Sequence, residues 1–221
     1  MQHPDPGRSE AVAPNYNLGL RLGSAPQINE EDFVGREVEL EELQKLLAPR
    51  RKSQNVVALY GLGGIGKTQL SIQFARRSVD IYTSIFWLNA QDESTLKAGL
   101  AALAAQVMAE QKSASIYDSH EEERMVQQLR EWLSRPDNDG WLLLYDNYDN
   151  PLVPGITSTR SYDIRNYFPH RVQGSILITT RSPRLGFAKQ LAVKKLTDIN
   201  QSLSILATRS GREIVRGKEP Y

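Results

Sequence analysis

Residues 56–77 read VVALYGLGGIGKTQLSIQFARR and combine a short apolar run, a glycine-rich turn and a helix-compatible segment. Within the turn, Gly61, Gly66, Lys67 and Thr68 match the spacing G-x-x-x-x-G-K-[ST]. Glycine lets the backbone bring its N–H groups against an anion, and the N-terminus of the following helix directs further N–H groups to the same place. The stretch therefore predicts a phosphate-binding loop (P-loop) between a strand and a helix. Lys67 can reach the β- and γ-phosphates of a nucleotide, and the Thr68 hydroxyl can ligate Mg²⁺.

The composition excludes several other classes of protein. The 221 residues are 40% hydrophobic and 24% charged, with a formal net charge of +1, which favours neither a specific nucleic-acid partner nor an acidic membrane surface. No apolar run approaches the roughly 18 residues of a membrane span, and the N-terminus has no apolar core typical of a secretory signal. The lack of cysteine excludes a disulfide scaffold and fits a reducing compartment, so we expect a cytoplasmic protein.

Hydrophobic patterning predicts strands that alternate with helices, and hence an α/β fold with a parallel sheet. The expected strands are 56–60, 83–89, 141–145, 175–180 and 191–193, and the expected helices after the P-loop helix are 93–111, 120–134, 185–190 and 199–212, with a further helix at 38–47. Residues 1–30 are expected to form a tail or linker that is ordered only where it docks, 31–208 the nucleotide-binding domain, and 209–221 a C-terminal tail.

Two of these strands end in polar residues, where ligands bind in parallel α/β sheets. The apolar strand 141–145 is followed by Asp146, the pattern of a carboxylate that holds Mg²⁺ directly or through water. Asn147 comes next, and because an amide cannot accept the proton of an attacking water, it indicates slow hydrolysis. Asp149 is the nearby acidic substitute, although an aspartate there also suits a turn cap.

The strand 175–180 is followed by a cation. Arg181 is expected to face the γ-phosphate next to the P-loop and to report its presence, and the Thr180 hydroxyl is a second expected polar contact. A surface arginine at the end of a strand is the alternative. We group Lys67, Asp146 and Arg181 as candidate catalytic residues and Thr68 with Asp146 as the candidate Mg²⁺ site.

Together, these motifs resemble the NB-ARC-type nucleotide-binding domain of STAND or NOD-like receptor (NLR) proteins. The matching segments are Phe33–Glu37 (FVGRE), Gly61–Thr68, Leu142–Asp146 and Thr179–Arg181, in that order, and SIFWLNAQ at 84–91 is typical of fungal members. The resemblance covers about residues 30–208 and implies a P-loop NTPase, a three-layer αβα sandwich whose predicted strands, numbered along the chain, have the order 5-1-4-3-2. It assigns contacts with ATP or ADP to Val34, Arg36, Gly61, Gly63, Gly64, Ile65, Gly66, Lys67, Thr68, Gln69, Thr180 and Arg181.

The resemblance implies an ATP/ADP switch that signals by oligomerisation in innate immunity or cell death, with weak ATPase activity at most. The winged-helix and repeat segments of the family are absent from these 221 residues, so a homo-oligomer or the other domains of a longer receptor are the expected partners. A P-loop ATPase with genuine turnover and a scaffold with a structural nucleotide are the alternatives. No guanine-reading N-K-x-D motif is found, which favours ATP over GTP.

Charge is distributed unevenly along the chain. Residues 118–149 carry nine acidic and three basic side chains, whereas residues 181–221 carry nine basic and three acidic side chains. Two solvated faces would explain this pattern, and so would head-to-tail attraction between neighbouring copies of the chain.

Overall fold

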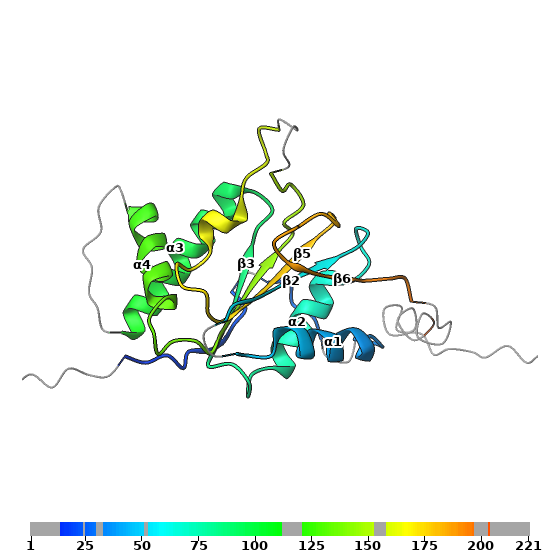
Figure 1. Ribbon diagram of the computed structural model, residues 1–221, viewed down its shortest axis with the longest axis horizontal. Coiled ribbons are helices and arrows are strands. Elements are labelled where there is room, and N and C mark those ends of the chain that lie inside the picture. The colour runs from blue at the N-terminus through cyan, green and yellow to red at the C-terminus, as the bar shows by residue number, and fades with distance from the viewer. Residues whose placement is uncertain are drawn as a thin grey trace, which may run out of the picture.

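A parallel sheet of six strands forms the centre of the molecule (Figure 1). Its order is β1 (Gly19–Arg21), β3 (Ser84–Asn89), β4 (Trp141–Asp146), β5 (Ser175–Thr180), β2 (Asn55–Tyr60) and β6 (Lys189–Ala192). The computed structural model describes residues 14–23, 25–29, 33–50, 53–111, 121–152, 158–196 and 203. The predicted α/β fold and the order of its five predicted strands are confirmed, and β1 is added at one edge.

Helices cover both faces of the sheet and complete the three expected layers (Figure 1). α1 (Glu37–Leu47) and α2 (Lys67–Arg77) pack on one face, and α3 (Glu93–Glu110) and α4 (Glu121–Leu133) on the other. The central strands β4 and β5 are buried along their whole length, which explains their nearly continuous apolar sequences.

The buried apolar residues form two clusters, one on each face of the sheet, because successive side chains of a strand point to opposite faces. Ile85 and Leu142 face α1 and α2, whereas Phe86 and Leu143, one residue further along each strand, face α3 and α4. On α3, the buried side chains Leu96, Leu100, Leu103 and Val107 form one stripe along the helix. None of the described helices is long and apolar enough to cross a membrane.

The segment expected to be a tail contributes the edge strand β1. Its residues pair in parallel with β3, from Gly19 opposite Ser84 to Arg21 opposite Phe86. Before the strand, the Ser84 hydroxyl donates to the carbonyl of Tyr16 at 2.8 Å and accepts from the N–H of Leu18 at 3.1 Å. Three half-exposed residues are too few to show the alternation of a strand, so only the pairing with β3 identifies this element.

The region after β5 differs from the predicted short helix at 185–190. Residues 185–188 form a turn, in which the N–H of Ala188 donates to the carbonyl of Leu185 at 3.0 Å, and β6 begins at Lys189. Pairing with β2 outweighs the local helix preference, because β6 can satisfy its backbone groups against the exposed edge of the sheet. The helix predicted at 199–212 lies outside the described residues, except for Leu203.

Candidate nucleotide-binding site

The P-loop connects β2 to α2 at the carboxyl edge of the sheet. Gly64 has φ 74° and Gly66, the N-cap of α2, has φ 99°, which are conformations that favour glycine. The loop borders a cavity of about 640 Å³, a size typical of small-molecule sites. The cavity is lined by Arg36, Gly63, Gly64, Ile65, Gly66, Lys67, Thr68, Gln69, Asn147, Asp149, Arg181, Lys195 and Leu196.

The charge of this cavity suits a polyphosphate. Its lining includes four basic side chains, those of Arg36, Lys67, Arg181 and Lys195, and the single carboxylate of Asp149. The Lys67 ammonium donates to the carbonyls of Gly61 at 2.9 Å and Leu62 at 3.0 Å, so it lies over the loop it follows. Partial burial lowers the pKa of Lys67, although the charge of Asp149 counters this effect.

The predicted metal-binding pair is in direct contact. The Thr68 hydroxyl lies 2.9 Å and 3.0 Å from the two carboxylate oxygens of Asp146, although Thr68 is in α2 and Asp146 ends β4. Thr179 donates to the same carboxylate at 2.6 Å and the Asn147 amide donates at 3.2 Å. Asp146 is 1% exposed, and its burial raises the pKa of the carboxyl group while the bonds from Thr179 and Thr68 oppose the rise.

These oxygen atoms fit Mg²⁺. Magnesium prefers oxygen ligands and is often bound through one or two protein groups together with phosphates and water. No cluster of three or more His, Cys, Asp or Glu side chains with metal-binding geometry occurs within the described ranges. The Thr68 hydroxyl and the Asp146 carboxylate are the oxygen atoms that would hold the ion beside the P-loop. When bound there, Mg²⁺ would neutralise charge on the phosphates.

Arg181 lies against the P-loop, as the strand order requires. The Cβ position of Gly63 is 3.7 Å from the Cζ atom of Arg181. The Arg181 Nε atom forms an ion pair with Asp149 at 2.7 Å, and the Arg181 backbone N–H donates to the same carboxylate at 2.8 Å. Asp149 therefore has a specific partner across the site.

Arg36 connects three parts of the site. Its guanidinium donates to Glu39 at 2.7 Å, to the carbonyl of Lys194 at 2.6 Å and to the carbonyl of Ile65 at 3.2 Å. Arg36 thus joins α1 and the P-loop to residues 193–196, the segment that follows β6 and that we call the strap. Its side chain lines the cavity, but these contacts commit its donors to protein atoms.

Three predicted contact residues do not line the cavity. Thr180 is fully buried, and its hydroxyl accepts from the N–H of Ser182 at 3.0 Å, so it shapes the turn after β5. Gly61 lies where β2 ends, with its N–H bonded to the Thr180 carbonyl at 3.3 Å. Val34 is half-buried before α1 and is also absent from the lining.

Sequence reasoning missed two residues of the lining. Lys195 and Leu196 belong to the strap, which follows the strand next to β2 at the carboxyl edge of the sheet. The rule that ligands bind at this edge applies to them as it does to Asp146 and Arg181. The predicted strand at 191–193 was thus the available signal, because Lys195 and Leu196 follow it by two and three residues.

Comparison with known proteins agrees with this arrangement. The model of the AAA ATPase domain matches residues 32–154, which is more than half of the chain. The chain belongs to the AAA ATPase domain family. The match includes the P-loop, the Thr68–Asp146 pair and the first residues of the segment after β4.

Individual proteins that are similar to this AAA ATPase domain include a fungal protein and a crystal structure. A "nucleotide-binding leucine-rich repeat (NLR)-like protein" of Hyaloscypha variabilis is 30% identical over 172 residues, which are 72% of this chain and 16% of that protein. The crystal structure of Cdc6p from Pyrobaculum aerophilum matches with a TM-score of 0.52 and 13% identity, over 85% of this chain and 51% of that one. The first likeness confirms the resemblance to NLR-type nucleotide-binding domains, and the second confirms the fold.

Proposed function

We propose that this chain is an ATP/ADP-binding switch domain of an NLR-like signalling protein, with slow ATP hydrolysis. The observation that carries the proposal is the composition of the cavity. It gathers the P-loop residues Lys67 and Thr68 with Arg181. The buried Asp146 carboxylate contacts the Thr68 hydroxyl from outside the lining, whereas the residue after Asp146, which does line the cavity, is an amide. Such a site can hold a nucleotide with Mg²⁺ and respond to its γ-phosphate, but the one carboxylate among its described lining residues, Asp149, is paired with Arg181 and is not free to activate water.

Each residue has a distinct role in this proposal. The backbone N–H groups of residues 63–68 and the Lys67 ammonium bind the phosphates, and Thr68 and Asp146 hold Mg²⁺. Arg181 contacts the γ-phosphate, and Arg36 keeps the strap against the P-loop so that Lys195 and Leu196 complete the cavity. In this role Arg36 supports the nucleotide site through the strap.

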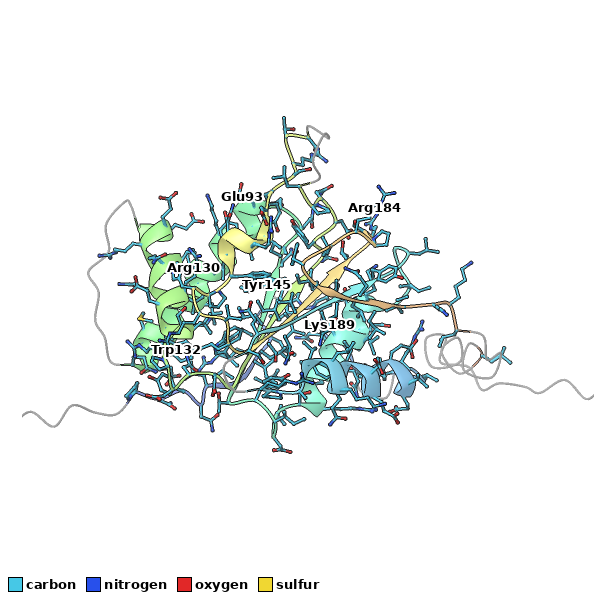
Figure 2. All side chains as sticks on the ribbon, viewed as in Figure 1. Glu93, Arg130, Trp132, Tyr145, Arg184 and Lys189 are labelled. Carbon is cyan, nitrogen blue, oxygen red and sulfur yellow. The ribbon has the colours of Figure 1, made fainter. Side chains whose placement is uncertain are left out.

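We further propose that the nucleotide state controls association between copies of the domain in the cytoplasm. Exposed acidic residues lie on and after α4, and exposed basic residues lie around β6 and the strap. Figure 2 marks α4, which covers one face of the sheet, by Arg130, and the edge strand β6 by Lys189. Opposite charges in these two separate regions support head-to-tail association, because the acidic region of one copy would attract the basic region of its neighbour. An output in innate immunity or cell death is proposed from the likeness to the NLR-like protein.

Binding and turnover test the proposal together. Calorimetric titration with ADP, ATP and GTP, each with Mg²⁺, should give submicromolar to micromolar binding of the adenine nucleotides. The Lys67→Ala variant should bind them at least tenfold more weakly, because it loses the ammonium contact with the phosphates. Phosphate release should remain well below the roughly 10 s⁻¹ of an ordinary enzyme, and steady hydrolysis at that rate would favour an ATPase instead.

The oligomeric state separates a switch from a scaffold. Size-exclusion chromatography with light scattering should give different masses with ADP and with a non-hydrolysable ATP analogue. Equal masses under both conditions would contradict the switch and favour a structural nucleotide.

A further inference from the structure

Asp149 uses both carboxylate oxygens on one residue. Its Oδ1 atom accepts from the backbone N–H of Arg181 at 2.8 Å, and its Oδ2 atom pairs with the Arg181 Nε atom at 2.7 Å. Asp149 thus contacts both the backbone and the guanidinium group of the same residue. Since the Arg181 side chain is 69% exposed, this carboxylate is the main restraint on its direction among the contacts described.

The turn that carries Asp149 is itself anchored to β5. The N–H of Asn147 donates to the Thr179 hydroxyl at 2.9 Å, and the N–H of Tyr148 donates to the Thr179 carbonyl at 2.9 Å. The Tyr148 side chain is 1% exposed, and its hydroxyl donates to the carbonyl of Tyr162 at 2.7 Å. The carboxylate therefore has a fixed position from which it can orient Arg181.

The geometry also determines which nitrogen atoms of Arg181 remain for a ligand. Asp149 engages the Nε atom, while the Nη1 atom lies 3.9 Å from the Cβ position of Gly63. Terminal guanidinium nitrogens beside the P-loop can donate to a phosphate in the planar, forked manner that arginine offers. A phosphate on the loop would thus meet donors that are already directed towards it.

We propose that Asp149 is a positioning residue that directs Arg181 towards the γ-phosphate and so makes the site prefer ATP over ADP. The inference rests on the proposed function and goes beyond it. An exposed arginine loses side-chain freedom when it binds, and a carboxylate that has already ordered it reduces that cost. ADP lacks the γ-phosphate, so its affinity should depend little on the direction of Arg181.

A set of substitutions in the full chain tests this role. Asp149→Asn keeps an acceptor for the backbone N–H of Arg181 but loses the charge that holds Nε. We expect a five- to tenfold loss of affinity for a non-hydrolysable ATP analogue in calorimetry, and less than a twofold change for ADP. Combining it with Arg181→Ala should abolish the additional loss, because Asp149 would have no side chain left to direct.

A matched control is available outside the site. Asp163 pairs with Arg165 at 2.6 Å, and neither residue lines the cavity, so Asp163→Asn should change neither affinity. Thermal unfolding of each variant checks that the fold is retained.

Four results would overturn the inference. Unchanged or stronger binding of the analogue by Asp149→Asn would show that the carboxylate does not favour the γ-phosphate. An equal loss for ADP and the analogue would indicate a purely structural role, and lost hydrolysis with unchanged binding would indicate a general base. Failure of the unmodified chain to bind either nucleotide would instead overturn the proposed function, and this inference with it.

Discussion

The Thr179 hydroxyl donates to the Asp146 carboxylate at 2.6 Å and accepts from the N–H of Asn147 at 2.9 Å. One side chain of β5 thus serves two groups at the end of β4, one of them a carboxylate that is 1% exposed. These two hydrogen bonds of Thr179 connect the candidate Mg²⁺ site to the core of the sheet.

Thr179→Val should therefore destabilise the fold. The substitution keeps the shape of the side chain but leaves a buried carboxylate and a backbone N–H without this partner, which should lower the free energy of unfolding by about 1–3 kcal/mol in denaturant titration. Thr95→Val is the control, because it breaks a comparable bond of 2.9 Å to Asp92 at the half-buried start of α3. Equal losses of unfolding free energy in the two variants would contradict the prediction that breaking the buried hydrogen bond is more costly than breaking the half-buried one.

Asn147→Asp should increase ATP hydrolysis. Asn147 has φ 67°, a left-handed conformation that aspartate also tolerates, and it lines the cavity beside Asp146. A carboxylate there can accept the proton of an attacking water, so we expect at least a tenfold rise in phosphate release, up to the roughly 10²–10⁴-fold of general base catalysis. Asn147→Ala removes the amide without adding a base, and an equal rise in that variant would contradict the explanation.

Arg36→Ala should weaken nucleotide binding by about tenfold, the effect of losing roughly 1.4 kcal/mol of binding free energy. The substitution removes the donor that holds the Lys194 carbonyl at 2.6 Å, and with it the link between the strap and the P-loop. Trypsin should then cleave after Lys194 and Lys195 more rapidly in limited proteolysis. Arg184→Ala removes an exposed arginine elsewhere (Figure 2) and should change neither property; a matching effect would indicate general electrostatics.

Gly61→Ala should destabilise the junction between the P-loop and the strap. A Cβ atom at this position would lie 2.7 Å from the carbonyl oxygen of Val193, whose N–H donates to Tyr60 at 2.8 Å. Moving that backbone should cost about 1–3 kcal/mol, measurable as a lower Tm. At Gly63, an added Cβ atom would meet the Arg181 side chain at an ordinary 3.7 Å, so Gly63→Ala should leave the Tm nearly unchanged. A similar fall in both variants would contradict the steric explanation.

Alkaline pH should weaken the fold through Tyr82. Burial raises the pKa of Tyr82 from 10 to about 12, and its hydroxyl donates to the carbonyl of Leu47. The folded pKa lies above the unfolded one, so this contribution is complete below pH 10 and is lost as the pH rises towards 12. The free energy of unfolding should therefore fall by up to about 1.4 kcal/mol per pH unit for this group across that interval.

Tyr82→Phe isolates this contribution. The variant should be about 1 kcal/mol less stable at neutral pH, because it loses the hydrogen bond, and its stability should fall less steeply above pH 10. Tyr60→Phe, at a half-buried ring, serves as the matched control. An unchanged alkaline slope in Tyr82→Phe would contradict the assignment.

Local patterns in the chain account for most of the fold and for the centre of the site. The glycine spacing of residues 61–66 identified the P-loop, because a backbone that surrounds an anion needs residues without a side chain. Continuous apolar runs identified β4 and β5, because strands buried on both faces have no polar side. The resemblance to NLR-type domains supplied the order of the strands, which periodicity leaves open.

What the sequence determined is therefore the set of elements and the polar residues at their ends, since these depend on neighbours along the chain. The tertiary structure decided which of those residues meet. Asp149 and Arg181 are 32 positions apart and pair because β4 and β5 lie side by side. Arg36, an expected nucleotide contact, reaches the Lys194 carbonyl across 158 positions and so also joins the strap to the P-loop. Such contacts depend on distances across the sheet, and these exist only once the strands have paired.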